Sequence, residues 1–256
     1  MSEGRAERLH SRFLGIRKNE RPSRTSHAHV VDDLGKAIVS GAFPVGTILP
    51  GDNELVERYK VSRTVLRESM KTLAAKGLVV PRARVGTRVT DRIYWNMFDN
   101  EILNWHFESG VNKEFLLHLY DIRMAFEPLA ARLVAERASS EDIDILRRLA
   151  ASMSAPHHTS DSLAVADLHF HLAITEASQN PFVRSLGGLI EAALVGMFRI
   201  SAPASSNDFA TIADTHMAIV DAIAARDCLA AQKAMEFVII DGRQQVLSGF
   251  AALSKV

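Results

Sequence analysis

The chain is poor in cysteine, with Cys228 the only one among its 256 residues. A lone cysteine cannot form an internal disulfide, and this usage is typical of a reducing compartment. Long apolar runs are also missing, since no uninterrupted apolar stretch reaches the roughly 18 residues that a bilayer-spanning helix needs. The first residues, MSEGRAERLHSRF, are charged and lack the apolar segment of a secretory signal. We therefore expect a cytoplasmic protein with no membrane partner.

The net charge is zero, but the charges are divided unevenly along the chain. Residues 1–90 hold 17 Lys and Arg against 9 Asp and Glu, whereas residues 91–256 hold 13 against 21. A basic front end on an acidic remainder suggests a polyanion-binding module joined to a module with another task; clustered solvated charge is the alternative. Residues 1–28, with seven basic side chains and little periodicity, are expected to form a flexible arm.

The elements predicted for residues 29–92 follow the order of a winged helix-turn-helix. Apolar spacing predicts a first helix at 29–40, and a short second helix follows Pro50. Ser62 is suited to cap a third helix. Two β-prone runs around a glycine-containing hairpin come next, within 78–90. We therefore expect a DNA-binding domain over this part of the chain.

The third helix has polar and basic side chains at its N-terminal end, where a recognition helix meets base edges and phosphates. Arg63 and Arg67 are four residues apart, so both point outward on one face. The hairpin offers two further arginines beside a glycine. The DNA-contacting residues predicted in this way are Ser62, Arg63, Thr64, Arg67, Arg82, Arg84 and Gly86. The alternative is a solvated helix with ordinary surface arginines.

The remainder of the chain, residues 93–256, is predicted to be a single all-helical domain. No strand signal appears after residue 91. Apolar spacing predicts helices at 99–109, 112–138, 140–153, 160–178, 181–201, 208–226 and 228–249. The expected fold is therefore mainly α, with an N-terminal winged helix-turn-helix and a C-terminal helical bundle.

Ionisable side chains fall on apolar helix faces in this helical part. Asp167 and His171 lie about 40° apart on the apolar stripe of one helix, and His216 lies within the stripe of another. Buried groups of this kind must be paired or bound to a metal, and oxygen and nitrogen donors suit Zn, Ni or Mn. The alternative is two core histidines that are hydrogen-bonded to Asp167.

Arg123 also falls within an apolar stripe, on the long helix predicted at 112–138. A buried guanidinium needs a carboxylate partner. Glu127, one turn further along the helix, is the simple partner, and the carboxylate of a bound metabolite is the alternative. We expect an effector-binding site formed by Arg123, Asp167, His171 and His216.

The N-terminal part resembles the DNA-binding domain of the GntR superfamily. The similarity lies in the run from Gly41 to Pro50, in Glu54-Leu55, and in the run from Val61 to Glu68. Members bind operators as two-fold dimers through the recognition helix and wing, so the resemblance implies an operator in double-stranded DNA and a homodimer. A basic residue often occupies the position of Asn53 in that pattern, which weakens any expectation that Asn53 contacts a phosphate or a guanine.

The helical part resembles the FCD effector domain of the FadR subfamily, over 120–137, 167–171, 180–181 and 216–227. The resemblance implies a dimerising bundle of six or seven helices. In many members one Asp and three His hold a divalent metal that helps to bind an organic acid. Three of these ligands match Asp167, His171 and His216, whereas Val238 stands at the fourth position and cannot ligate. A three-ligand site completed by water or effector and a metal-free pocket both stay open.

The segment from Trp95 to Trp105 resembles the one after the wing in galactonate-responsive repressors of this subfamily, which also lack the third histidine. The resemblance favours a sugar acid as the small carboxylate effector. The segment 199–212, expected to line the pocket with Ser201, Ala202 and Ile212, is small and apolar and indicates no specificity.

These patterns predict a DNA-binding regulator, a repressor of an operon for a carbohydrate acid or related carboxylate, with operator binding modulated by that acid. A metal-dependent enzyme is a rival class, but the sequence contains no His-Glu-x-x-His motif, nucleophile elbow or glycine-rich phosphate loop. A second rival is a ligand-independent DNA-binding protein whose helical domain only dimerises.

Overall fold

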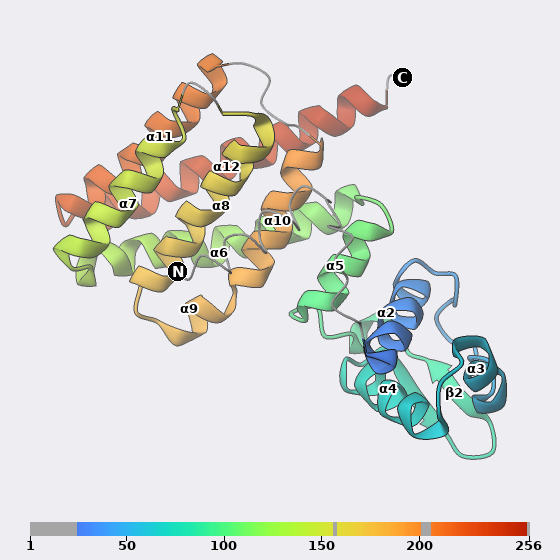
Figure 1. The fold of residues 1–256 in the computed structure, drawn as a ribbon. Coiled ribbons are helices and arrows are strands. Elements are labelled where there is room, and N and C mark those ends of the chain that lie inside the picture. The colour runs from blue at the N-terminus through green and yellow to red at the C-terminus, as the bar shows by residue number, and fades with distance from the viewer. Residues whose placement is uncertain (1–24, 156–157, 201–205, 255–256) are drawn as a thin grey trace. The chain divides into compact units, whose positions relative to one another are not determined.

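The computed structural model describes residues 25–155, 158–200 and 206–254. The described chain forms two compact units that divide between Asn112 and Lys113. The first combines helices with a small sheet, and the second consists of helices alone among its described residues (Figure 1). The predicted mainly α fold is confirmed. No helix in the described ranges is long and apolar enough to cross a membrane.

The N-terminal unit has the predicted order of a winged helix-turn-helix. Its elements are α2 (Ser26–Val39), α3 (Asp52–Tyr59), α4 (Arg63–Ala75), β1 (Val79–Arg82), β2 (Gly86–Val89), the short helix η1 (Arg92–Tyr94) and α5 (Asn100–Glu108). The two strands pair antiparallel, with Val79 opposite Val89. Ser62 caps α4, because its side chain accepts a hydrogen bond from the backbone N–H of Val65.

The flexible arm predicted at 1–28 falls largely outside the described residues, which begin at Thr25. The last part of that prediction is wrong, because residues from Ser26 onward belong to α2. The side chain of Thr25 accepts a hydrogen bond from the backbone N–H of Ala28 and so caps the helix.

Helix α5 belongs to the N-terminal unit. The predicted boundary between residues 92 and 93 had placed it in the helical domain. The reason is its packing against α2, where the Trp105 ring lies directly over Gly35. A Cβ atom at Gly35 would come within 2.3 Å of that ring. The indole Nε1 of Trp105 donates a hydrogen bond to Asp32 at 3.0 Å, which fixes the ring on α2.

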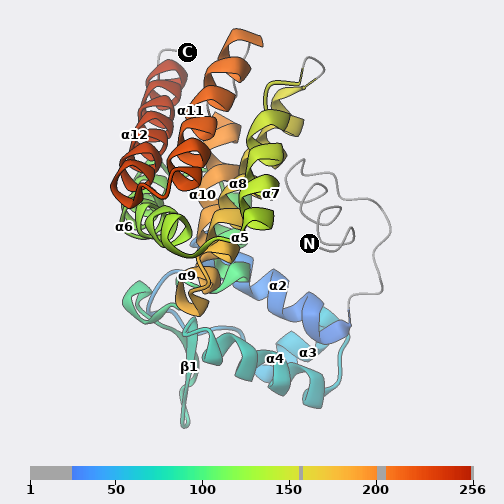
Figure 2. The same cartoon turned by 90° about the vertical axis from the view of Figure 1, so that its left-hand side faces the viewer.

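The second unit is a helical bundle with α6 at its centre. Its helices are α6 (Lys113–Arg137), α7 (Ser140–Ser152), α8 (Ser160–Ala177), α9 (Pro181–Ser185), α10 (Gly187–Ile200), α11 (Ser206–Ala224) and α12 (Cys228–Leu253). Figures 1 and 2 show α6, α8, α10, α11 and α12 side by side. Helix α6 contacts α8, α10, α11 and α12, so side chains on its buried face meet those of several helices.

The boundary signals of two helices in this bundle are confirmed. Ser139 and Asp142 form a reciprocal capping box at α7, and Asn180 caps α9 with Pro181 at its first turn. The single helix predicted at 181–201 is wrong, because the chain breaks at Leu186 into α9 and α10. Two glycines follow the break, and glycine is a poor helix former.

We expect the substitution Gly35→Ala to destabilise the N-terminal unit by about 1–3 kcal/mol, because the added methyl group must displace the Trp105 ring. Both tryptophans of the chain lie in this unit, so tryptophan fluorescence during urea unfolding reports on it alone. Gly51→Ala is the control, since a Cβ there meets no atom within 4 Å. Equal shifts for the two variants would show that the ring is not held against α2.

Candidate functional site

The start of α4 presents polar and basic side chains to solvent, as predicted for a recognition helix. Arg63, Thr64 and Arg67 are all exposed, whereas Leu66 on the opposite face is buried in the core. Arg67 forms no ion pair with any carboxylate in the described part of the chain. A free guanidinium at the N-terminal end of a helix is available to a phosphate or a base edge.

The wing presents the remaining predicted residues. Arg82, Arg84 and Gly86 are exposed at the turn between β1 and β2. Arg84 and Gly86 have positive φ angles, of 61° and 115°, so the chain reverses tightly here. The wing is held to the body of the unit by Arg88, whose Nε donates a hydrogen bond to the carbonyl of Gly46 at 2.9 Å.

Asn53, for which the sequence offers little reason to expect a DNA contact, contacts Arg63 of the predicted recognition helix. The Nη2 of Arg63 donates a hydrogen bond to Oδ1 of Asn53 at 3.1 Å. Asn53 lies in the first turn of α3, so the contact ties the two helices of the helix-turn-helix. The bond restricts the positions that the Arg63 guanidinium adopts.

A second site lies inside the helical bundle, where α6, α8 and α11 converge. Five ionisable side chains are buried there, and none is more than 4% exposed. They are Arg123, Glu127, Asp167, His171 and His216. The structure thus brings together all four residues that the sequence predicted to form an effector-binding site, and adds Glu127. Buried groups of this charge must be paired with one another or with a ligand.

Arg123 and Glu127 form an ion pair within α6, so the simpler of the two expected partners is present. The Nε of Arg123 donates to Oε1 of Glu127 at 2.5 Å. Burial acts to raise the pKa of Glu127, but Arg123 and His171 outweigh it and lower that pKa to about 2. The pair is therefore charged at neutral pH, with the guanidinium held by its own helix.

Both histidines turn the Nε2 atom of the ring toward the centre of the cluster and the Nδ1 atom away from it. The Nδ1 of His171 contacts Oε2 of Glu127, and the Nδ1 of His216 lies 2.7 Å from the carbonyl oxygen of Ile212. Each Nδ1 thus faces an acceptor to which it can donate a hydrogen. In the tautomer with the hydrogen on Nδ1, the Nε2 atom of each ring has a lone pair, which is the form that binds a metal ion.

The two Nε2 atoms converge on Asp167. Its Oδ1 lies 2.9 Å from Nε2 of His216 and 3.7 Å from Nε2 of His171. The two Nε2 atoms are 3.4 Å apart. Three electron-pair donors this close repel one another unless a proton or a cation lies between them.

The donor set fits a divalent metal ion. One ligand atom from each of Asp167, His171 and His216 lies within 4.8 Å of the others. Oδ2 of Asp167 is buried with no hydrogen-bond partner among the described residues. Burial acts to raise the pKa of Asp167, but His171 and His216 lower it below its ordinary value, so the carboxylate is ionised. Val238 on α12 is half-buried and offers no donor atom.

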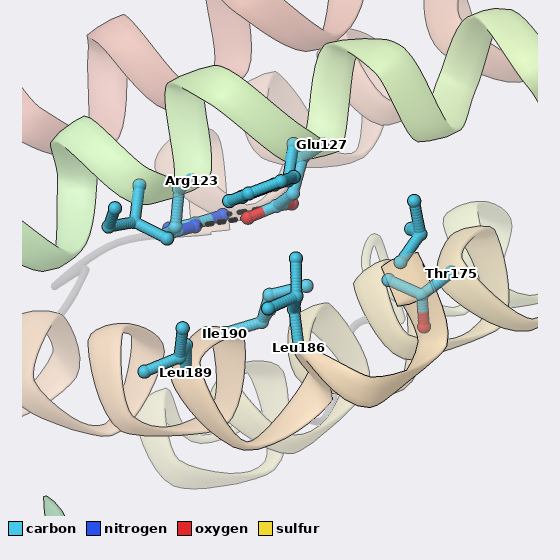
Figure 3. A pocket seen from close by; sticks show the side chains of 9 residues that line it. Arg123, Glu127, Thr175, Leu186, Leu189 and Ile190 are labelled. Atoms are coloured by element: carbon cyan, nitrogen blue, oxygen red, sulfur yellow. Dashed lines mark hydrogen bonds and ion pairs between the residues drawn. The ribbon is translucent and has the colours of Figure 1, made fainter. Parts of the chain in front are cut away.

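A small cavity adjoins the cluster on the side of Arg123 and Glu127 (Figure 3). The other side chains that line it come from α6, from the end of α8, and from the segment containing α9 and α10; they are Ile122, Phe126, Thr175, Val183, Leu186, Leu189 and Ile190. Its volume of about 10 Å³ leaves room for about one water molecule. Of the pocket residues expected at 199–212, Ser201 and Ala202 lie outside the described residues, and Ile212 is half-buried.

Sequence reasoning missed Tyr120, which precedes Arg123 by one turn on the same face of α6. Its side chain is buried, and the Cζ atom of Arg123 lies 5.2 Å from the centre of its ring. Helical spacing to Arg123 was the signal available in the sequence.

Comparison with protein families identifies both units. Residues 27–89 match the profile described as bacterial regulatory proteins, gntR family, and residues 118–239 match the FCD domain. Neither match depends on the geometry above. The first covers the helix-turn-helix and wing, and the second covers the helices that hold the buried cluster.

Two curated relatives come from Escherichia coli strain K12. The uncharacterized HTH-type transcriptional regulator YieP is 36% identical over 212 residues, which cover 82% of this chain and 90% of YieP. The galactonate operon transcriptional repressor is 30% identical over 205 residues, which cover 80% of this chain and 90% of the repressor. The solved structure of Lar from Listeria monocytogenes aligns with a TM-score of 0.60 at 18% identity, over 89% of this chain and 99% of Lar. That likeness supports the fold alone.

We expect Arg123→Ala to destabilise the helical unit by about 3–5 kcal/mol, because it leaves the Glu127 carboxylate buried without its guanidinium. Urea unfolding followed by circular dichroism measures the change. Arg243→Ala is the matched control, since it breaks an exposed pair with Asp121 and should cost at most about 1 kcal/mol. A loss for Arg123→Ala no larger than that of the control would contradict the buried pair.

Proposed function

Because the chain belongs to the GntR family of bacterial transcription regulators, with an FCD domain behind its DNA-binding domain, we propose that it is a repressor whose operator affinity falls when a sugar acid binds to the helical domain. The buried cluster of Arg123, Asp167 and the two histidines is the observation that supports acid sensing most strongly. The target is an operon for the catabolism of that acid or a related carboxylate.

DNA binding by the N-terminal unit is a property of the family, and the contacts are our proposal. The side chains of Arg63, Thr64 and Arg67, at the start of α4, enter the major groove. Ser62 caps α4 and so fixes where that helix begins. The wing places Arg82 and Arg84 on the phosphate backbone beside Gly86, where the absence of a side chain allows close approach. Two such heads in a homodimer contact two half-sites of one operator.

The choice of a sugar acid rests on a relative and on chemistry. The galactonate operon repressor of Escherichia coli is similar to this chain over most of its length. Arg123 is neutralised by Glu127, and the ionised Asp167 gives the cluster a negative charge. A divalent ion among the donor atoms reverses that charge, which favours a carboxylate with further oxygen atoms. The cavity is smaller than such an acid, so binding requires the surrounding helices to move apart.

We propose that Asp167, His171 and His216 hold a divalent ion such as Zn, Ni or Mn. When bound, the ion supplies a positive charge and an open coordination position for an effector oxygen. Glu127 fixes the orientation of His171, as outer-shell carboxylates do for metal-binding imidazoles. Because Val238 supplies no ligand, an ion held by these three residues has one more open coordination position than an ion held by four protein ligands.

The link between acid and operator is a coupling free energy between two sites. Acid in the bundle favours one arrangement of the two DNA-binding heads in the dimer, and that arrangement fits the operator less well. A coupling of about 1–3 kcal/mol lowers operator affinity by about 5- to 150-fold. A protein whose helical domain only dimerises has no need of a buried charged cluster, because apolar side chains pack a bundle at lower cost.

Operator affinity should fall steeply with salt concentration, because arginine–phosphate contacts release counterions.

We expect Arg67→Ala to weaken specific binding by about 1–3 kcal/mol. The measurement is fluorescence anisotropy with a duplex that the protein has selected from random sequences. Arg148→Ala, an exposed arginine on α7, is the control. A flat salt response, or equal affinities for the two variants, would remove α4 from the interface.

A thermal-shift screen of aldonic, uronic and dicarboxylic acids tests the sensor. We expect a sugar acid such as D-galactonate to raise the unfolding temperature of the zinc-loaded protein, and chelator or His216→Ala to abolish the rise. His118→Ala on the exposed face of α6 is the control. A rise that survives chelator but not Arg123→Ala indicates a metal-free pocket. If no acid produces a shift, the helical domain is not an acid sensor.

A further inference from the structure

The hydroxyl of Tyr120 is a buried polar group without a partner. The side chain is 1% exposed, and no described residue accepts the hydrogen of its hydroxyl. The other two tyrosines of the chain differ, because Tyr59 donates to Asp33 at 2.5 Å and Tyr94 is 70% exposed. Native proteins rarely leave a buried hydroxyl unpaired, since it loses its bonds to water on folding.

The groups around this hydroxyl cannot serve it. A Cβ atom at Gly242 of α12 would lie 3.1 Å from the Tyr120 oxygen and 3.3 Å from Sδ of Met197, so the hydroxyl faces the glycine beside a thioether. A thioether sulfur is a weak acceptor. The guanidinium of Arg123 lies over the ring, with its Cζ atom 5.2 Å from the ring centre, and is a donor only, so it cannot accept the hydrogen of the phenol.

Gly242 leaves space at this point for a reason other than backbone conformation. It lies within α12, where any residue adopts the helical φ angle, and glycine weakens a helix interior. Any side chain at 242 would press on the Tyr120 hydroxyl. The missing side chain therefore lets the Tyr120 hydroxyl lie against α12 at this point.

Tyr120 shares a face of α6 with the charged cluster. Tyr120, Arg123 and Glu127 follow at spacings of three and four residues, and all three are buried. Burial raises the pKa of Tyr120 well above its usual range, so the phenol keeps its proton and is a hydrogen-bond donor at neutral pH. The face thus presents a neutral donor one turn from a guanidinium.

We propose that the Tyr120 hydroxyl contacts the effector, donating a hydrogen bond to an oxygen of the bound organic acid. This assignment rests on the proposed function of the helical domain as an acid sensor. The hydroxyl is left unpaired in the free protein and gains its partner on binding. Its removal therefore weakens acid binding without weakening the fold.

The experiment compares Tyr120→Phe with the wild-type protein and with the control Tyr94→Phe, which removes an exposed hydroxyl from the other unit. D-galactonate binding to the zinc-loaded proteins is measured by isothermal titration calorimetry. The unfolding temperature without ligand and the affinity for Zn²⁺ alone are measured for each protein. We expect Tyr120→Phe to lose about tenfold in D-galactonate affinity, with Zn²⁺ affinity unchanged and the unfolding temperature equal or higher.

Three results would overturn the assignment. Equal D-galactonate affinities for Tyr120→Phe and wild type would show that the hydroxyl does not contact the acid. A lower unfolding temperature for Tyr120→Phe without ligand would show that the hydroxyl has a structural partner, such as a trapped water molecule. Absence of D-galactonate binding to the wild-type protein would contradict sensing of this acid itself, and with it the role of Tyr120.

Discussion

The ion pair between Arg123 and Glu127 is the interaction on which the buried cluster depends. Both side chains are almost fully buried on α6, where an unpaired charge would be strongly unfavourable. The pair neutralises itself and leaves the second oxygen of Glu127 to contact His171. Because that contact involves Nδ1, the Nε2 edge of the imidazole is turned toward Asp167 and His216. The ion pair on α6 thus sets the orientation of His171 on α8, whereas the carbonyl of Ile212 orients His216 on α11.

An apolar core would hold these helices together at lower cost, so the charges call for a functional explanation. The Nε2 atoms of the two histidines crowd around Asp167, and one oxygen of Asp167 has no partner among the described residues. A cation resolves both features, and an acid that binds beside it changes the balance of charge within the bundle. In the function proposed above, that change is the means by which acid binding favours one arrangement of the DNA-binding heads over another.

Much of this arrangement could be predicted from local sequence signals. The Ser62 cap and the spacing of Asp167, His171 and His216 depend on residues within a few turns, and periodicity captures them. The packing of Trp105 on Gly35 could not be predicted, because it joins helices far apart in the chain and moves the domain boundary. The unpaired hydroxyl of Tyr120 was missed for a similar reason, since only the fold places Gly242 and Met197 around it.

The central claim is that the inward Nε2 atoms and Asp167 surround a metal ion. Anomalous diffraction at the zinc edge, from crystals grown with Zn²⁺ and D-galactonate, measures this directly. The account predicts one peak inside the bundle, at about 2.0–2.2 Å from His171 Nε2, His216 Nε2 and an Asp167 oxygen, with an effector oxygen bound to the same ion. No peak among these residues, with the acid bound elsewhere or not at all, would contradict it.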